Sequence, residues 1–184
     1  NLGLDVIVTD HHSVPDSLPL ALAIINPKRD GCSYPSRDLS GAGVAFKLLQ
    51  ALYGELAPDS GPDYLLDMVA LGTVADIVPL VGENRYLAKK GLELLNREPR
   101  PGLMELMRRA NVQPGTVGAD SIAWALAPLL NSAGRMDHAM TSYDLLTTCD
   151  TEQARGLAAQ LEEKNCQRQA LTKEVFESAR EQVM

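Results

Sequence analysis

The stretch Leu4-Asp5-Val6-Ile7-Val8-Thr9-Asp10-His11-His12 decides the fold class, because a short apolar, β-branched run ends abruptly in polar side chains. Such a run is typical of a strand covered on both faces in a parallel sheet. A second run, Ala21–Ile25, closes at Asn26-Pro27, and the proline stops that strand from continuing as a central ladder member. The sequence therefore predicts an α/β fold that begins with strands of a parallel sheet.

Helical patterns follow the two strands. Each helix is expected to begin at a capping residue or a proline: Ser40, Pro62, Asn84, Pro101, Asp120 and Asp150. Gly54 is predicted to end the first helix after Tyr53, and Pro128 to interrupt or kink the fifth. The last helix should run from Asp150 to the end of the chain with sparse apolar positions. We interpret it as an interdomain linker, 150–184, which follows a domain at 1–149.

The composition excludes several classes of protein. The chain has 184 residues, 45% of them apolar, and a net charge of −7. No apolar run approaches the roughly 20 residues that span a bilayer, so a cytoplasmic protein with no membrane contact is expected. Cys32, Cys149 and Cys166 lack metal-ligand spacing, which indicates reduced thiols. The acidic balance means that nucleic-acid binding needs a local basic patch, metal ions or residues outside this chain.

Asp10-His11-His12 lies where a buried strand ends, which is the edge where ligands collect in open α/β sheets. Neighbouring side chains on an extended backbone point in different directions. One imidazole can therefore face a metal and the other a substrate phosphate, while the carboxylate orients an imidazole through its second ring nitrogen. The alternative is a solvated polar strand end.

Asp76 is the other candidate, because it stands between an apolar helix and Ile77-Val78-Pro79-Leu80. A carboxylate in core-like sequence needs a cation nearby, either a metal ion or an arginine. The alternative is that Asp76 caps the segment that follows.

Basic groups occur in two further segments. Asn131-Ser132-Ala133-Gly134-Arg135-Met136 reads as a small-residue turn that presents one guanidinium, a group suited to bidentate phosphate binding. Lys28, Arg29 and Arg37 form a basic group in the loop after the second strand. A surface ion pair for Arg135 and a solvated loop for the others are the alternatives. His138, beside Asp137, is expected to have no specific role.

Five blocks of the sequence, in this order, resemble the RecJ branch of the DHH phosphoesterase family. They are Val8–His12, Ile25–Lys28 with Ser33-Tyr34-Pro35, Gly41–Leu48, Leu71–Leu80 and Asn131–Met136. The resemblance covers nearly the whole chain. It implies a fragment of an exonuclease that degrades single-stranded DNA from the 5′ end with two Mn²⁺ or Mg²⁺ ions, in DNA repair and recombination. Two such ions can activate a water and stabilise both attacking and leaving oxygens.

The resemblance also implies roles for particular residues. His11 and Asp76 look like metal ligands, Asp10 like a ligand or a partner of one, and His12 like a phosphate contact or general acid. Asn131, Arg135 and Lys28 look like nucleic-acid contacts. Single-stranded DNA is the implied substrate, with a helicase or single-strand-binding protein as a further partner, and a monomer is expected.

The chain departs from the family pattern in three ways. The family's acidic strand motifs would precede Asn1, its C-terminal DHH-associated domain would follow Met184, and Leu129 stands where a basic residue is expected. We therefore interpret the chain as a middle piece that is inactive by itself. Two other functions stay open. One is a DHH phosphodiesterase for oligonucleotides or small phosphoesters, and the other is a catalytically silent DHH scaffold.

Overall fold

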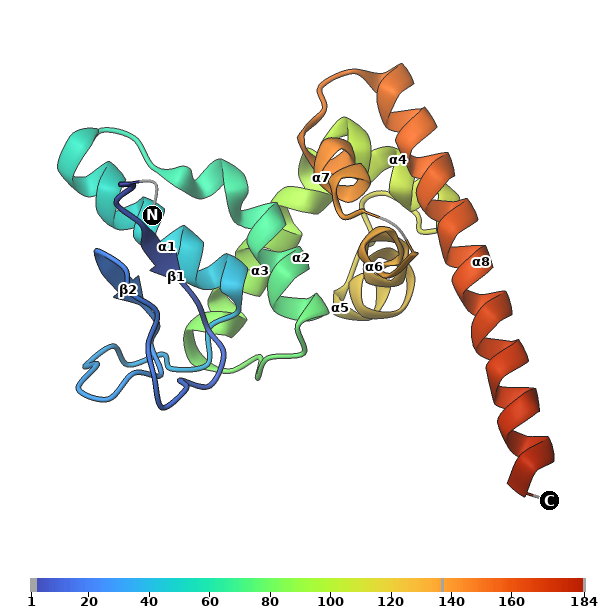
Figure 1. Cartoon of the computed structure of the whole chain (residues 1–184). Coiled ribbons are helices and arrows are strands. Elements are labelled where there is room, and N and C mark those ends of the chain that lie inside the picture. The colour runs from blue at the N-terminus through green and yellow to red at the C-terminus, as the bar shows by residue number, and fades with distance from the viewer. Residues whose placement is uncertain (1–2, 137, 184) are drawn as a thin grey trace. The chain divides into compact units, whose positions relative to one another are not determined.

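The computed structural model describes residues 3–136 and 138–183. The chain divides into two compact units, residues 1–94 and 95–184, here called the N-terminal unit and the C-terminal unit. The N-terminal unit is blue to green in Figure 1 and contains the two strands; the C-terminal unit is helical. The predicted order, parallel strands followed by helices, is confirmed.

The sheet of the N-terminal unit pairs β1, Ile7–Thr9, with β2, Ala23–Ile25. The strands are parallel, with Ile7 opposite Ala23 and Thr9 opposite Ile25. The expectation that β1 is covered on both faces is wrong for the described residues: Leu4 is 73% and Ile7 is 55% exposed. Helix α1 contacts β1, and no second described layer covers these side chains.

Helix α1, Gly41–Leu56, begins as predicted, because the Ser40 hydroxyl oxygen accepts a hydrogen bond from the Gly43 amide at 3.1 Å. Gly54 does not end it. The helix continues to Leu56 and closes with the Ala57 amide donating to the Tyr53 carbonyl at 2.8 Å. Gly54 lacks the positive φ of a capping glycine, so it is an ordinary helical residue here.

Two further helices complete the N-terminal unit. A 3₁₀ turn, Pro62–Leu65 (η1), leads into α2, Leu66–Ala75, as the proline predicts. Helix α3, Gly82–Arg97, starts before Asn84, so the predicted cap at Asn84 is wrong. The Asn84 side-chain amide instead donates to the Asp38 and Pro79 carbonyls, at 2.7 and 3.1 Å, and ties two loops to the helix.

The core of the N-terminal unit lies between these helices and the loop before α1. Its fully buried members are Leu39, Val44, Phe46, Leu66, Val69 and Leu87. A cavity of about 590 Å³ lies between β2, the following loop and α1, and Asn26, Cys32 and Val44 are among the residues that line it. The three cysteines are free and exposed.

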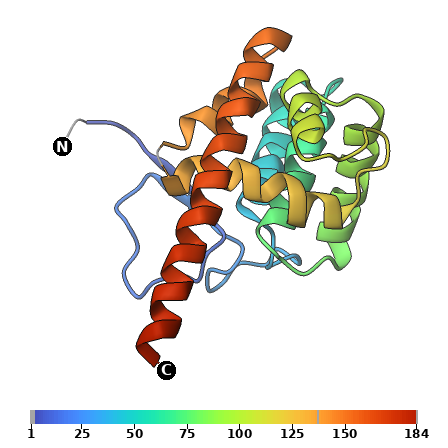
Figure 2. The same cartoon turned by 90° about the vertical axis from the view of Figure 1, so that its right-hand side faces the viewer.

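The C-terminal unit packs shorter helices along one long helix (Figure 2). Helix α8, Thr151–Val183, contacts α4, Pro101–Arg109, α6, Ala127–Met136, and α7, Met140–Thr147. As predicted, the Asp150 carboxylate caps α8 by accepting from the amides of Glu152 and Gln153. The contact uses Ala154, Ala158 and Leu161, which are fully buried. The later residues Leu171, Val175 and Phe176 are exposed, and the linker role of α8 stays a prediction.

The segment between α4 and α6 differs from the prediction. Helix α5, Ala119–Ser121, is capped at Gly118, not at Asp120, and a π-helical turn, Ile122–Leu126 (η2), joins it to α6. Residues 119–136 form a continuous helical run, and Pro128 lies directly after its π-helical turn, in which the Ala127 amide donates to the Ile122 carbonyl. Because proline has no amide to donate to the preceding turn, this departure from α-helical bonding agrees with the predicted interruption at Pro128.

The predicted turn at Asn131–Met136 is instead the second half of α6. Its small residues serve close packing of helices: Ala133 is fully buried, and the buried Ser132 hydroxyl donates to the Leu161 carbonyl of α8 at 3.1 Å. Asp137 lies outside the described residues. In the described part of the chain, no helix has both the length and the apolar composition needed to cross a bilayer.

Candidate metal centre

The end of β1 is held in place by the end of β2. The Asp10 amide extends the ladder by donating to the Ile25 carbonyl at 2.9 Å. The side-chain amide of the buried Asn26 donates to the His12 carbonyl at 3.0 Å. The Asp10-His11-His12 backbone is therefore fixed at both ends. Sequence analysis missed Asn26, because its partner lies on the other strand and leaves no local pattern.

The Asp10 carboxylate organises this segment. Its Oδ1 accepts from the backbone amides of His11 and His12 at 2.8 and 3.3 Å, and lies 2.7 Å from His12 Nδ1. The contact with the His12 ring, followed by the two amide bonds, lowers the pKa of Asp10 to about 2. Asp10 is thus an anion that orients the His12 ring, which leaves Nε2 as that ring's other nitrogen.

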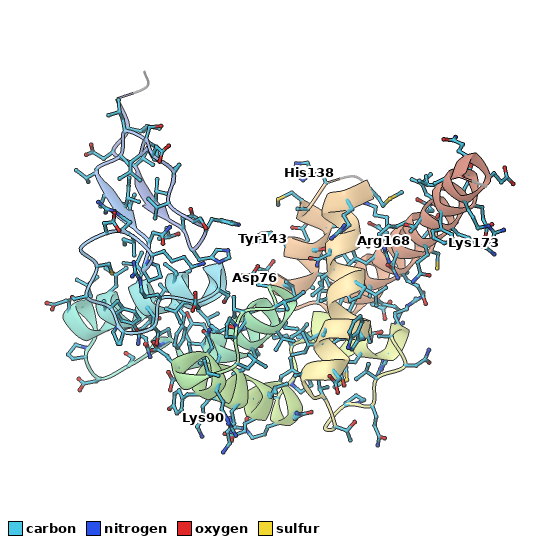
Figure 3. All side chains as sticks on the ribbon, turned by 90° about the horizontal axis from the view of Figure 1, so that it is seen from below. Asp76, Lys90, His138, Tyr143, Arg168 and Lys173 are labelled. Atoms are coloured by element: carbon cyan, nitrogen blue, oxygen red, sulfur yellow. The ribbon has the colours of Figure 1, made fainter. Side chains whose placement is uncertain are left out.

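The strand end and α2 bring His11 and Asp76 together. Asp76, which is labelled in Figure 3, caps the C-terminus of α2. Its Oδ2 lies 3.3 Å from His11 Nδ1. The His11 side chain is 16% exposed and the Asp76 side chain 39%, so the pair is open to solvent on the Asp76 side. The two residues thus converge as the sequence predicts, although their role as metal ligands stays a prediction.

The two histidine rings lie close together but face different partners. Their centroids are 4.3 Å apart with planes inclined by 45°. His11 Nδ1 faces Asp76, whereas the more exposed His12, 77%, turns its Nδ1 to Asp10. The two imidazoles therefore face different carboxylates, and their division between a metal and a substrate stays a prediction.

Gly41 keeps the His11 ring in position. An added Cβ at Gly41 would lie 3.3 Å from His11 Cδ2, so the ring packs directly on the first turn of α1. Sequence analysis treated Gly41 as part of a motif and assigned it no role.

The His11 and Asp76 pair has the donor chemistry of a divalent-metal site. An imidazole nitrogen and a carboxylate oxygen, without thiolate, suit Mn²⁺ or Mg²⁺. Their separation of 3.3 Å is close to the roughly 3 Å expected between neighbouring ligands at right angles on an ion with bonds of about 2.1 Å. Within residues 3–136 and 138–183, no group of three His, Cys, Asp or Glu residues could hold a metal. The described residues thus fit the ion but provide only part of a coordination shell.

A second, partly buried network braces the loop between β2 and α1. The Tyr34 hydroxyl donates to Glu83 Oε2 at 2.7 Å, and Lys47 Nζ lies 3.1 Å from Glu83 Oε1. Burial, followed by the hydrogen bond to Glu83, raises the pKa of the Tyr34 hydroxyl. Burial alone would raise the pKa of Glu83, but hydrogen bonds from Tyr34 and Lys47 outweigh it and lower that pKa.

The basic loop residues have structural contacts of their own. Arg29 donates to the Ile24 carbonyl at 2.7 Å, and Arg37 donates to the Lys28 carbonyl at 2.9 Å. These guanidinium groups therefore help to shape the loop. Lys28 is partly buried, and its predicted DNA contact stays a prediction.

Asn131 and Arg135 lie on α6 in the C-terminal unit, whereas His11 and Asp76 lie in the N-terminal unit. Both are exposed, and a spacing of four residues places them on one face of the helix. Leu129 is buried, as befits an apolar core residue. His138 has a local contact, because its Nδ1 accepts from the Met140 amide at the start of α7.

Comparison with known proteins agrees with the resemblance found in the sequence. Residues 1–73, which include the Asp10-His11-His12 segment, match the DHH family, N-terminal domain. Over 182 residues the chain is 45% identical to the single-stranded-DNA-specific exonuclease RecJ of Bacillus subtilis, and over 176 residues 42% identical to that of Escherichia coli. The resemblance to the DHH family is thus supported for residues 1–73.

The similarity covers most of this chain but only part of each relative. The alignments include 99% and 90% of the chain, yet 22% of the Bacillus protein and 30% of the Escherichia protein. The chain therefore spans about a quarter of the length of these curated relatives.

Solved structures agree with this assignment. The chain matches the crystal structure of RecJ from Thermus thermophilus in complex with Mn²⁺, with a TM-score of 0.84 and 33% identity. That match covers 96% of this chain and 26% of the other. A second crystal structure, of exonuclease RecJ bound to manganese, matches with a TM-score of 0.85 and 34% identity, over 96% of this chain and 44% of the other.

Proposed function

We propose that this chain is a segment of a RecJ-like exonuclease that hydrolyses phosphodiester bonds of single-stranded DNA from the 5′ end. The observation that carries the proposal is the 3.3 Å approach of His11 Nδ1 to Asp76 Oδ2, two residues on separate elements. The similarity to single-stranded-DNA-specific exonucleases supports the substrate. A role in DNA repair and recombination, in a cytoplasmic monomer that works with a helicase or single-strand-binding protein, is part of the same proposal.

The residues at the end of β1 and at the end of α2 would have different roles in the reaction. His11 and Asp76 would hold a divalent metal, and Mn²⁺ is supported by the two manganese-bound RecJ structures. Bound divalent metal would lower the pKa of a water and offset charge on the phosphate. Asp10, held by two backbone amides, orients the His12 ring through its contact with Nδ1. His12 would then donate a hydrogen bond or a proton from Nε2 to a phosphate or leaving oxygen.

The test uses the full-length protein that contains this chain. His11→Ala and Asp76→Ala should each reduce Mn²⁺ binding in calorimetry and abolish hydrolysis of a 5′-labelled single strand, while the circular dichroism spectrum stays unchanged. His138→Ala and Asp59→Ala are matched controls, because both residues are exposed and distant in sequence from the pair. A near-normal rate in either test variant would remove that residue from the metal site.

Two alternatives give different results in the same protein. An enzyme for oligonucleotides or small phosphoesters would hydrolyse a dinucleotide faster than a long single strand. A silent scaffold would bind neither Mn²⁺ nor Mg²⁺ and would hydrolyse neither substrate.

A further inference from the structure

The residue that follows Asp76 adopts a backbone conformation that isoleucine disfavours. Ile77 has φ of +57°, in the left-handed region. This position, directly after the C-cap of a helix, is usually occupied by Gly and sometimes by Asn. For a β-branched side chain the left-handed region brings a steric cost, and such residues cluster at functional sites.

A second helix in the same chain shows that the turn does not require isoleucine. Helix α4 ends with Ala110 as its C-cap and Asn111 at φ of +54°, the counterpart of Ile77. The backbone bonds are also alike. The Asn111 amide donates to the Arg108 carbonyl at 3.3 Å, and the Ile77 amide to the Val74 carbonyl at 3.2 Å. At α4 the position is filled by a residue that tolerates the conformation.

Burial does not explain the choice of isoleucine either. Ile77 is 89% exposed, so its side chain contributes almost nothing to the core. Leu80 and Val81, in the same loop, are 40% and 69% exposed. Ile77 thus has a strained backbone and an exposed apolar side chain, and it stabilises neither the helix end nor the core. Its side chain is therefore available for a contact outside the described fold.

The location of Ile77 indicates what it contacts. Its Cα is one peptide unit, about 3.8 Å, from that of Asp76, whose carboxylate lies 3.3 Å from His11. We propose that Ile77 is a substrate-contacting residue that packs its aliphatic side chain against a nucleobase next to the cleaved phosphodiester; this rests on the proposed function. Apolar side chains, isoleucine among them, contact base faces in other nucleic-acid complexes. Every base has such a face, so the contact tolerates any sequence.

Such a contact suits the charge of this chain. With a net charge of −7, phosphate neutralisation provides little general affinity for DNA. An apolar contact with a base does not depend on charge, and it acts next to the residues that would hold the metal.

The first experiment separates stability from activity in the full-length protein. Ile77→Gly removes the strain and the side chain together. We expect it to raise the urea midpoint of unfolding, and to raise KM for single-stranded DNA about tenfold. Ile77→Val, which keeps a β-branched side chain, should restore most of the affinity. Asn111→Gly is the matched control at α4 and should leave KM unchanged.

The second experiment asks whether the contact is with a base. Single strands that lack the base of the first or second nucleotide at the attacked end are compared with the intact strand. The wild-type protein should have about a tenfold lower kcat/KM on one of these strands than on the intact strand. The Ile77→Gly variant should have the same kcat/KM on both strands. Removal of the base and removal of the Ile77 side chain would then have coupled rather than additive effects on kcat/KM.

The outcomes distinguish this inference from the function on which it rests. A wild-type protein that does not hydrolyse single-stranded DNA would remove the proposed function itself. If the wild type is active, a lower urea midpoint for Ile77→Gly would show that the side chain packs against the protein. An unchanged KM, or equal losses by variant and wild type on both base-lacking strands, would also overturn the contact.

Discussion

At Asp10 a single carboxylate oxygen is approached by three nitrogen atoms, the amides of His11 and His12 and the Nδ1 of His12. The backbone amides fix the carboxylate, and the carboxylate fixes the ring. The residue therefore acts through His12 in this structure, and its low pKa keeps it charged at neutral pH.

Asp10→Asn tests this role. Asparagine keeps an oxygen for the backbone amides but loses the charge beside the ring, so kcat of the full-length enzyme should fall roughly ten- to a hundredfold. Because Asp10 acts through His12, the same change should cost little in a His12→Ala background. If the two losses multiply instead, Asp10 has an independent role, such as direct metal binding.

Acid should lower the free energy of unfolding through Asp10 and Glu83. Both have a folded-state pKa below the ordinary value, so the folded state binds fewer protons than the unfolded state below about pH 5. Their contribution is complete above that pH and is lost as the pH falls towards about 2, the pKa of Asp10. Urea titrations across this range measure it. Asp10→Asn and Glu83→Gln should each give a flatter dependence, and unchanged slopes would contradict the assignment.

Between elements, α2 and α3 approach so closely that only glycine fits at position 91. An added Cβ there would lie 2.0 Å from the Leu66 carbonyl oxygen. Gly91→Ala should therefore destabilise the protein by about 1–3 kcal/mol. Gly54→Ala is the matched control: it is helical, has no atom within 4 Å of an added Cβ, and should stabilise by up to about 1 kcal/mol. Thermal unfolding of both variants measures the difference, and similar shifts would show that the contact is not tight.

The same elements show what could be predicted from the sequence. Ser40, Pro101 and Asp150 start helices through local hydrogen bonds or a fixed φ, so residues close in sequence suffice to predict them. The end of α1 and the helix at Asn131–Met136 were predicted wrongly, because Gly54 and the small residues of α6 read as turn formers. At α6 their small size serves packing against α8, which is a tertiary requirement.

In the candidate site, too, the residues with a local sequence pattern could be predicted, and those that depend on tertiary contacts could not. Asp10-His11-His12 and Asp76 could be found because each is a polar group at the end of an apolar run. Asn26 and Gly41, which hold the His12 carbonyl and the His11 ring, could not, because their contacts join elements far apart in sequence. The left-handed φ of Ile77 could not be predicted either, because isoleucine, unlike glycine or asparagine, rarely adopts this conformation.

For the molecule as a whole, this chain produced by itself is expected not to hydrolyse single-stranded DNA. Its described residues provide His11 and Asp76 but no group of three potential metal ligands, whereas Mg²⁺ takes about six. Incubating the purified chain with a labelled single strand and Mn²⁺ tests this, with the full-length protein as the positive control. Mn²⁺-dependent hydrolysis by the chain that Asp76→Ala abolishes would contradict it.

The cavity beside β2 is a place where small molecules could bind this protein without resembling the charged substrate proposed for it. Cys32 and Asn26 both line it, and Asn26 is the residue whose amide holds the His12 carbonyl. An electrophilic fragment tethered to the Cys32 thiol would therefore occupy a space bordered by a support of the histidine pair. Mass spectrometry of intact protein would identify the fragments that attach to the thiol. A nuclease assay of the full-length protein would then show which of these fragments inhibit hydrolysis.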